Sequence, residues 1–226
     1  MKPMTHLTTT LFSLVLSLLC TGASYANEKI GILVFDGVLT SDVTAPIEVF
    51  GAATNESWFT SYDVVTIAVS NEKAVKTAEG LQITADKLLA DKPEVDVLLL
   101  PSAYDMEPLI NNKELITYIQ DTSKKAKWMA SNCSGSSLLA EAGLLDGRKA
   151  TTWAGGEDAF ANAYPKVDVQ HDVNYVIDGP FLTSNGGAVS YEAALALLSQ
   201  LASQSKAQTI SENLQLPRLL NAKLAQ

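Results

Sequence analysis

The residue best placed to do chemistry in this sequence is Cys133, within the segment Ser-Asn-Cys-Ser-Gly-Ser-Ser that covers residues 131–137. An apolar run precedes the cysteine and a helical pattern follows it, which predicts a strand that turns directly into a helix. Such a turn is a nucleophile elbow, because it exposes one side chain at the edge of a sheet and aims the next backbone N–H groups toward it. The pattern therefore predicts a thiol whose pKa is lowered by the helix N-terminus, beside N–H donors for an oxyanion.

The alternative for Cys133 is a structural role, since cysteine is among the residue types most often buried in a core. Polar residues on both sides favour a reactive thiol. The usual partner of such a thiol is scarce, because histidine occurs only at positions 6 and 171. His171 lies between Gln170 and Asp172, a polar setting that indicates an exposed side chain. A three-histidine zinc site is excluded, and neither a metal-ligand cluster nor a cofactor motif is visible.

The first 26 residues have the pattern of an export signal. A short basic start at Lys2 is followed by an apolar stretch of about ten residues and by small residues before Ala26. Cleavage after Ala26 takes 26 of the 226 residues and leaves 200, residues 27–226, as a single domain. The leader takes Lys2 and no other charged residue, so 15 basic and 25 acidic residues remain and the mature net charge is −10. This balance argues against nucleic acid or a membrane as partner after cleavage, and we expect the protein in a bacterial periplasm.

The leader also takes one of the two cysteines. Cys20 lies at the end of the apolar stretch, and as a lipid-attachment site it is a weak alternative because Leu19 precedes it where a small residue is expected. Cys133 is then the one cysteine of the mature chain, so an internal disulfide is excluded. A lone thiol in an exported protein is a buried hydrophobe, an intermolecular link or a reactive group.

The elements expected to position Cys133 alternate between apolar runs and helical patterns, with no repeat or linker. Strands are expected over residues 30–35, 62–69, 96–100 and 128–131, and a hairpin over 173–177 and 181–183. Helices are expected over residues 44–50 (with Pro46 in the first turn), 107–120, 136–142, 188–202 and 210–224 (broken near Pro217). This alternation predicts an α/β fold with a mostly parallel sheet, helices on both faces, and ligands at the carboxyl ends of the strands.

Three segments of the sequence carry a resemblance to a known family. Residues 131–152 read SNCSGSSLLAEAGLLDGRKATT, residues 41–50 read SDVTAPIEVF and residues 182–187 read LTSNGG. With these segments the chain closely resembles the DJ-1/PfpI superfamily, in particular its isocyanide hydratase branch and the amidotransferase-like domains of some transcription regulators. The resemblance covers the mature chain without the regulators' DNA-binding extension. It implies a flavodoxin-like three-layer sandwich and, as is common among family members, a homodimer.

The resemblance also implies roles for individual residues. Cys133 matches the family's nucleophile, and the Ser134 N–H would form half of an oxyanion hole. The other half would come from the Ala103 N–H, in a turn where Pro101-Ser102-Ala103 replaces the family's Pro-Gly-Gly and leaves the loop conformation open. Asp42 matches the acidic residue that lies against the thiol in isocyanide hydratase-like members, with a helix N-cap as the alternative.

The expected pocket departs from many superfamily members at Trp153, where histidine is common after the Ala-Thr-Thr segment. A Cys–His pair at this place is impossible, which argues against peptidase and glutaminase chemistry. Trp153, Tyr104 and Asn132 are expected to line a substrate pocket, with core packing as the alternative for Trp153. Glu48 is a second acidic candidate near the thiol, although packing or solvent exposure is favoured for it.

The resemblance implies a hydratase-type or lyase-type enzyme that uses a Cys–Asp pair on a small electrophilic substrate, with no cofactor or metal. In isocyanide hydratase-like members the substrate is an isocyanide and the product an N-substituted formamide. A small carbonyl compound such as a glyoxal is a second option from the wider superfamily. The alternative is a non-catalytic thiol redox sensor or a small-molecule binding module, since an accessible low-pKa thiol also oxidises readily.

Overall fold

The structure, a computed structural model, describes residues 27–56 and 61–221. The expected signal segment with Cys20, and positions 222–224 of the expected last helix, lie outside these described residues. Within them a seven-stranded sheet has the order β10-β11-β7-β6-β1-β2-β5, and every neighbouring pair is parallel except β10 and β11. Its strands are β1 (Glu28–Val34), β2 (Tyr62–Ala68), β5 (Lys87–Leu88), β6 (Val97–Leu100), β7 (Trp128–Asn132), β10 (Tyr175–Asp178) and β11 (Phe181–Ser184).

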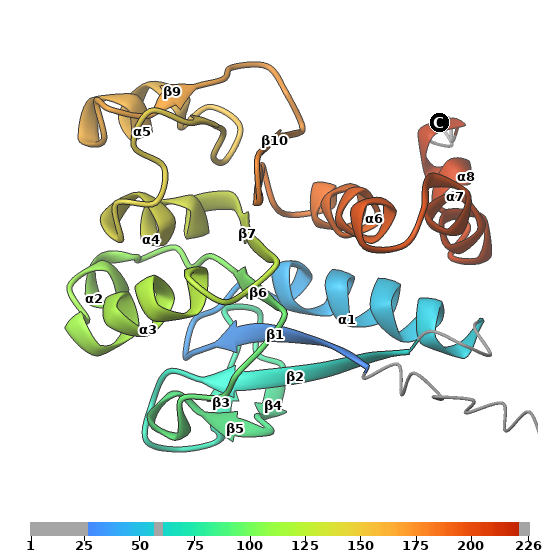
Figure 1. The fold of residues 1–226 in the computed structure, drawn as a ribbon, viewed down its shortest axis with the longest axis horizontal. Helices are drawn as coiled ribbons and strands as arrows, with labels where there is room; N and C mark the ends of the chain where they lie inside the picture. The colour runs from blue at the N-terminus through green and yellow to red at the C-terminus, as the bar shows by residue number, and fades with distance from the viewer. Residues whose placement is uncertain (1–26, 57–60, 222–226) are drawn as a thin grey trace, which may run out of the picture.

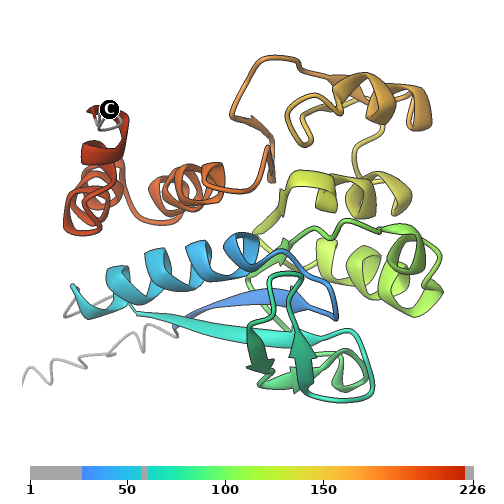
Figure 2. The ribbon, with the colours of Figure 1, turned by 180° about the vertical axis from the view of Figure 1, so that it is seen from behind.

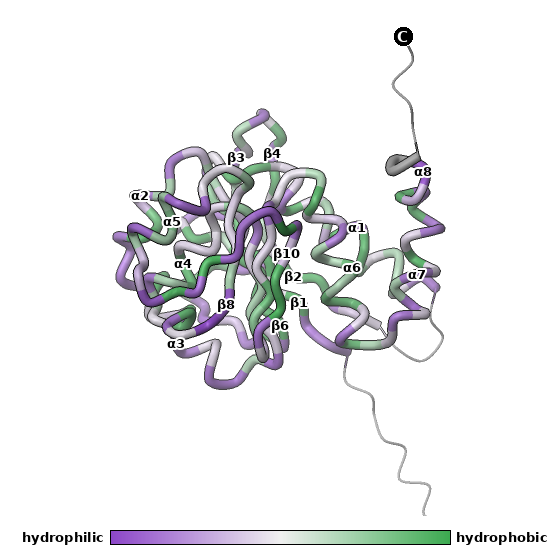
Figure 3. The backbone as a smooth tube through the Cα atoms, turned by 90° about the horizontal axis from the view of Figure 1, so that it is seen from above, coloured by the Kyte–Doolittle hydropathy of each residue, from purple (hydrophilic) through white to green (hydrophobic). Residues whose placement is uncertain are grey.

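Helices cover both faces of this sheet (Figures 1 and 3). One face carries α1 (Thr40–Asn55), α6 (Val189–Leu201) and α7 (Gln204–Asn213), which pack on one another. The other carries α2 (Glu107–Ile110), α3 (Lys113–Ser123) and α4 (Ser136–Glu141). Residues 30–34 and 97–100 of the inner strands are buried, as a parallel sheet between two helical layers requires. The predicted α/β fold with a mostly parallel sheet is therefore confirmed, and so is the predicted hairpin of β10 and β11.

The start of α1 differs from the expected one. The helix begins at Thr40 rather than Thr44, so Pro46 lies inside it and Asp42 is its third residue instead of its N-cap. Glu79 explains the earlier start, because its Oε2 accepts the Thr40 N–H at 2.9 Å and the Thr40 hydroxyl at 2.6 Å. Glu79 follows β3 (Ala74–Lys76), which pairs with β4 (Gln82–Thr84) in a hairpin beside the first turn of α1 (Figure 2). A distant carboxylate thus supplies the cap that the local sequence lacks.

Two expected helices are divided in the structure. The helical stretch over 107–120 forms α2 and α3, because Asn112 interrupts it and caps α3 by accepting the N–H groups of Glu114 and Leu115. The C-terminal stretch forms α7 and α8 (Leu216–Asn221), and the break falls at Gln215, whose φ is +60°, two residues before Pro217 and so near it, as predicted.

The structure also contains short elements that the sequence pattern did not predict. They include β5, the β3–β4 hairpin, η1 (Leu89–Asp91), α5 (Glu157–Ala163) and the pair β8 (Lys149–Ala150) with β9 (Asp168–Val169). Strands of two or three residues are too short to show an alternating pattern. None of the helices in the described ranges has the length and apolar character that crossing a membrane requires.

Candidate active site

Cys133 lies where β7 ends and the short turn η2 (Cys133–Gly135) leads into α4. Its φ is +52°, in the left-handed region that residues other than glycine rarely adopt, so the predicted elbow is confirmed. Gly135 makes this turn possible, because a Cβ at that position would lie 2.2 Å from the Leu100 carbonyl oxygen. The elbow is therefore packed directly on the carboxyl end of β6.

Hydroxyl groups hold the strained backbone of Cys133. The Oγ of Ser136 and the Oγ1 of Thr152 lie 3.1 and 3.2 Å from the Cys133 carbonyl oxygen, and 2.9 Å from each other. Asn185 in turn donates from Nδ2 to the Thr152 carbonyl at 2.6 Å. Strain of this kind persists only where the surroundings impose it, and these contacts connect the elbow to two neighbouring loops.

Asp42 is 0% exposed and accepts four hydrogen bonds. Ser102 donates to Oδ2 from its hydroxyl at 2.6 Å and from its N–H at 3.1 Å. Oδ1 accepts the Gly187 N–H at 3.0 Å and the Ser190 hydroxyl at 2.9 Å. Burial raises the pKa of Asp42 above its ordinary value, although all four hydrogen bonds act to lower it. The result is a carboxylate that is fully satisfied and yet more basic than one in water.

Ser102 links this carboxylate to the thiol. Its side chain makes a hydrogen bond with Cys133 as well as with Asp42. Burial raises the pKa of the Cys133 thiol, and the negative charge of Asp42 adds to that rise. The Ser102 hydroxyl and the Ser134 N–H act in the opposite direction without cancelling it. The predicted lowering of the thiol pKa is therefore wrong, because burial outweighs the donors at the elbow.

The expected oxyanion hole is only half open. The Ser134 N–H forms a hydrogen bond with the Cys133 thiol that lowers the pKa of this group. The Ala103 N–H instead donates to Met106 Sδ at 3.2 Å, so the second expected donor is already occupied. The loop that replaces Pro-Gly-Gly brings this thioether close, and the Ala103 carbonyl also accepts the Ser134 hydroxyl at 3.2 Å.

The three expected pocket residues have different surroundings. Asn132 is 2% exposed, and it donates from Nδ2 to the Asp42 carbonyl at 3.3 Å while its Oδ1 accepts the Ser184 hydroxyl at 2.7 Å. Asn132 is therefore not available to line the substrate pocket, because both ends of its buried amide are hydrogen-bonded to other groups. Trp153 is 37% exposed and lies over Gly156, where a Cβ would come within 1.8 Å of the indole. Tyr104 is 87% exposed and projects into solvent.

The remaining acidic and basic candidates interact elsewhere. Glu48 comes six residues after Asp42 on α1, which turns it to another side of the helix. It is exposed and accepts the Tyr191 hydroxyl at 2.6 Å. His171 is exposed, as predicted, and its Nε2 lies 3.0 Å from Asp158 Oδ1. The structure thus brings Asp42, Ser102 and Ser134 to the thiol and leaves Glu48 and His171 in other contacts.

A cavity of about 420 Å³ lies between residues 154–157, residues 171–174 and Asn185. Its lining includes Gly155, Glu157, His171 and Asn185. Asn185 precedes Gly186, and a Cβ at Gly186 would lie 2.5 Å from the Cys133 Cβ and 3.0 Å from Asp42 Oδ1. Asn185 thus connects the cavity to the loop beside the elbow, whereas Cys133 and Asp42 do not line the cavity itself.

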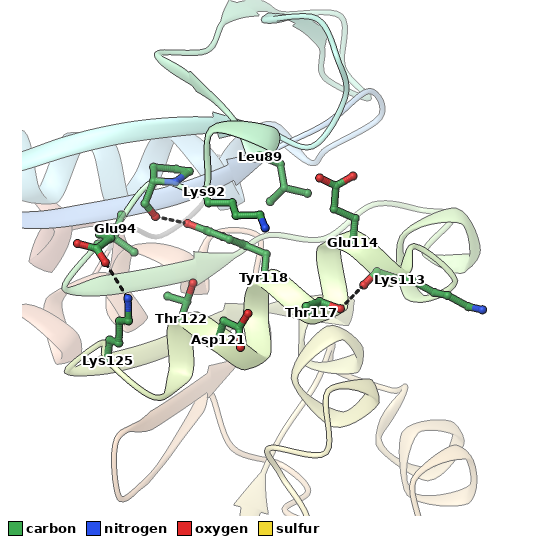
Figure 4. Close-up of a pocket in the computed structure, with 12 residues that line it drawn as sticks. Leu89, Lys92, Glu94, Lys113, Glu114, Thr117, Tyr118, Asp121, Thr122 and Lys125 are labelled. Carbon is green, nitrogen blue, oxygen red and sulfur yellow. Dashed lines mark hydrogen bonds and ion pairs between the residues drawn. The ribbon is translucent and has the colours of Figure 1, made fainter.

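A second cavity, of about 570 Å³, lies between α3 and the segment 89–95 that leads into β6 (Figure 4). Charged side chains such as Lys92 and Glu114 line it, and the Tyr118 hydroxyl donates to the Pro93 carbonyl at 2.8 Å. Because residues 89–95 precede β6, this cavity lies toward the amino ends of the strands, at the edge opposite Cys133. Among the described residues, no group of three or more His, Cys, Asp or Glu side chains is arranged to hold a metal ion.

Comparison with known proteins gives a consistent result. Residues 28–200 match the sequence profile of the DJ-1/PfpI family. The chain is 28% identical over 189 residues to an isonitrile hydratase of Pseudomonas putida, an alignment that covers 83% of this chain and 78% of that protein. It is 32% identical over 146 residues to the HTH-type transcriptional regulator CdhR of Pseudomonas aeruginosa, covering 64% of this chain and 43% of the regulator.

Solved structures show the same fold. A ThiJ/PfpI family protein from Pseudomonas syringae is similar with a TM-score of 0.74 and 26% identity, over 84% of this chain and 75% of that one. DJ-1beta of Drosophila melanogaster is similar with a TM-score of 0.73, over 84% of this chain and 98% of that one. Its 21% identity makes this second likeness one of fold alone.

Proposed function

The chain belongs to the DJ-1/PfpI family, and from that premise we propose that it is a cysteine-dependent hydratase of small electrophilic molecules, with isocyanides as the favoured substrate class. The observation that carries this proposal is the Cys133 thiol on a strained elbow, hydrogen-bonded through Ser102 to the buried Asp42 carboxylate. The similarity to an isonitrile hydratase over most of both chains supports the substrate class.

The chemistry begins with a thiol that must lose its proton. Burial raises the pKa of Cys133, so the nucleophile is generated during the reaction by a nearby base rather than stored as a thiolate. Asp42 suits that task because burial also raises its pKa, which strengthens it as a base. The sulfur attacks the terminal carbon of the isocyanide, and the proton passed to Asp42 is returned to that carbon. The product of this step is a thioimidate, with one new S–C bond and one new C–H bond.

Water completes the reaction. Its oxygen adds to the thioimidate carbon and one of its protons goes to nitrogen, which gives a tetrahedral adduct still bonded to sulfur. The C–S bond then breaks, the hydroxyl proton returns to the thiolate, and an N-substituted formamide leaves. Net, one water is consumed and Cys133 is restored. The Ser134 N–H at the sulfur is placed to stabilise negative charge that develops there.

The direct test is turnover by the purified protein with a set of isocyanides and glyoxals. We expect formamide formation that is lost in Cys133→Ala and at least about a hundredfold slower in Asp42→Asn, the range typical of losing a general base. Glu48→Gln is the matched control, since it neutralises an exposed carboxylate on the same helix. Glyoxal turnover without isocyanide turnover would show that the substrates are small carbonyl compounds instead of isocyanides.

The competing function is a thiol redox sensor. Such sensors use an accessible thiol of low pKa, whereas burial raises the pKa of Cys133, and this difference favours the enzyme. The sensor is preferred if no substrate turns over and Cys133 oxidises reversibly to a sulfenic acid. A thiol that resists alkylation in the folded protein contradicts both functions and leaves a structural cysteine.

We propose further that the enzyme acts as an exported homodimer. Export is supported by residues 1–26, which have the pattern of a signal peptide. The homodimer is supported by the superfamily, in which dimers are common. Expression of the full chain in a bacterium should give a periplasmic protein that begins at Asn27, which N-terminal sequencing detects. Light scattering should give twice the mass of the 200-residue chain. Cytoplasmic retention of the intact chain contradicts export. A monomer at micromolar concentration contradicts the homodimer.

A further inference from the structure

The Ser102 side chain is hydrogen-bonded with both members of the Cys–Asp pair. Its hydroxyl donates to Asp42 Oδ2 at 2.6 Å and forms a hydrogen bond with the Cys133 thiol. It is completely buried, so bulk water does not compete for these contacts. This residue stands in the Pro101-Ser102-Ala103 turn, where the resemblance to the family leads to the expectation of glycine.

We propose that Ser102 is a catalytic residue that relays the thiol proton from Cys133 to Asp42. The proposal deepens the proposed function, and it rests on that function only for the identity of the substrate. The thiol S–H proton moves to Ser102 Oγ while the Ser102 O–H proton moves to Asp42 Oδ2. One S–H and one O–H bond break and two O–H bonds form. The products are a thiolate and a neutral carboxylic acid, with Ser102 neutral before and after.

The hydrogen bonds around Asp42 favour proton transfer through Ser102. Each carboxylate oxygen already accepts two hydrogen bonds. A proton therefore reaches Asp42 by transfer along an existing bond, and both backbone N–H groups are too weakly acidic to supply it. Of the two hydroxyl donors, Ser190 comes from α6, and Ser102 is the one that also contacts the sulfur.

The backbone holds Ser102 in position for this relay. Its N–H donates to the same Oδ2 at 3.1 Å, and its carbonyl accepts the Leu39 N–H at 2.8 Å. The next residue, Ala103, forms an isolated β-bridge with Val38. The loops that follow β1 and β6 are thus tied together, and the hydroxyl stays between the carboxylate and the thiol.

The test compares Ser102→Ala with Ser190→Ala. Each variant removes one buried hydroxyl that donates to Asp42, so a role confined to holding Asp42 in place predicts equal effects. The measurement is the rate of Cys133 alkylation by iodoacetamide from pH 6 to pH 10 on the full mature chain. We expect Ser102→Ala to react at least about tenfold more slowly at pH 7 and to show a higher thiol pKa, since a hydrogen bond to a charged group is lost. Ser190→Ala should stay within about threefold of wild type, because its hydroxyl donates to Asp42 Oδ1 and is not among the groups that lower the pKa of Cys133.

Ser102→Thr is the conservative variant that keeps the hydroxyl, and it should restore most of the alkylation rate. Ser102→Gly, which introduces the family's residue, serves if Ser102→Ala does not fold, and it should behave as expected for Ser102→Ala. Equal alkylation profiles for Ser102→Ala and Ser190→Ala, or wild-type reactivity in Ser102→Ala, overturn the relay. Alkylation needs no substrate, so a slowed Ser102 variant in a protein that hydrates no isocyanide keeps the relay and refutes the hydratase. Full turnover in Ser102→Ala supports the hydratase and refutes the relay.

Discussion

Asn132 donates from Nδ2 to the backbone carbonyl of Asp42 at 3.3 Å, where a regular helix would place an N–H of its own. The residue four positions after Asp42 is Pro46, which lies inside α1 and has no N–H to give. The proline thus leaves the carbonyl available, and the end of β7 satisfies it. The helix that carries the carboxylate and the strand that carries the thiol are joined through this bond.

This relationship predicts coupling between the two positions. Asn132→Ala should lower the free energy of unfolding by about 1–3 kcal/mol, because the Asp42 carbonyl and the Ser184 hydroxyl both lose a partner in a buried place. In a Pro46→Ala background the new N–H can bond to the carbonyl, and the cost of Asn132→Ala should fall by at least about 0.5 kcal/mol. Urea denaturation of the four proteins of this cycle measures the coupling. Strict additivity of the two changes would show that the bond contributes nothing.

A second prediction concerns the close approach of Gly186 to the elbow. Gly186→Ala combines a φ of +75° with a Cβ only 2.5 Å from the Cys133 Cβ, so the elbow must move. Gly143→Ala is the matched control, with a φ of +73° and nothing within 4 Å of the new Cβ. The control should cost about 1–2 kcal/mol of stability from backbone strain alone. Gly186→Ala should cost more and should also change the alkylation rate of Cys133, which Gly143→Ala leaves unaltered. Equal costs with unaltered thiol reactivity contradict the close contact.

Met106 provides a third prediction, because its Sδ occupies the Ala103 N–H at 3.2 Å. A thioether is a weak acceptor, and leucine of similar volume accepts no hydrogen bond at all. Met106→Leu should therefore free the second oxyanion donor and raise the turnover number several-fold, with a stability change below about 1.5 kcal/mol. Steady-state kinetics with whichever isocyanide or glyoxal the protein turns over measures the change. Slower turnover with intact folding would instead assign Met106 a positive role in catalysis.

The sequence was sufficient for the elements whose determinants are local. The apolar runs of β1, β6 and β7 and the turn at Cys133 all carry their signal within about ten residues of chain. Asp42 could be found because it falls in a segment that resembles the family. The start of α1 could not be found, since the carboxylate of Glu79 that caps it lies 39 positions away.

The environment of the thiol could not be predicted from local sequence patterns, because it is formed by residues that are distant in the chain. The hydroxyls that hold Asp42 come from positions 60 and 148 residues away in the chain. Ser190 offered one weak signal, as a polar residue at the start of a strongly apolar helix. The thiol pKa was predicted in the wrong direction because a helix N-terminus is visible in the sequence, whereas the burial that outweighs it arises only on folding.

The last prediction is the pH dependence of stability that Asp42 imposes. Burial raises the pKa of Asp42 in the folded protein, so between its ordinary value near 3.9 and the raised value the folded state binds more protons than the unfolded state. Its contribution to stability is therefore fully present below about pH 4 and is lost as the pH rises through the folded pKa. The difference in unfolding free energy between wild type and Asp42→Asn should accordingly fall from pH 4 to pH 8.

Asp121→Asn is the control with the opposite sign. The hydrogen bond from Lys124 lowers the pKa of Asp121, so the corresponding difference should rise with pH as the carboxylate ionises in both states. Both differences can be measured by urea denaturation at fixed ionic strength, with the contributions of all other carboxyl groups cancelling. A difference for Asp42→Asn that rises with pH, as for Asp121, would mean that the four donors outweigh burial. Asp42 would then be too weak a base to receive the proton of Cys133.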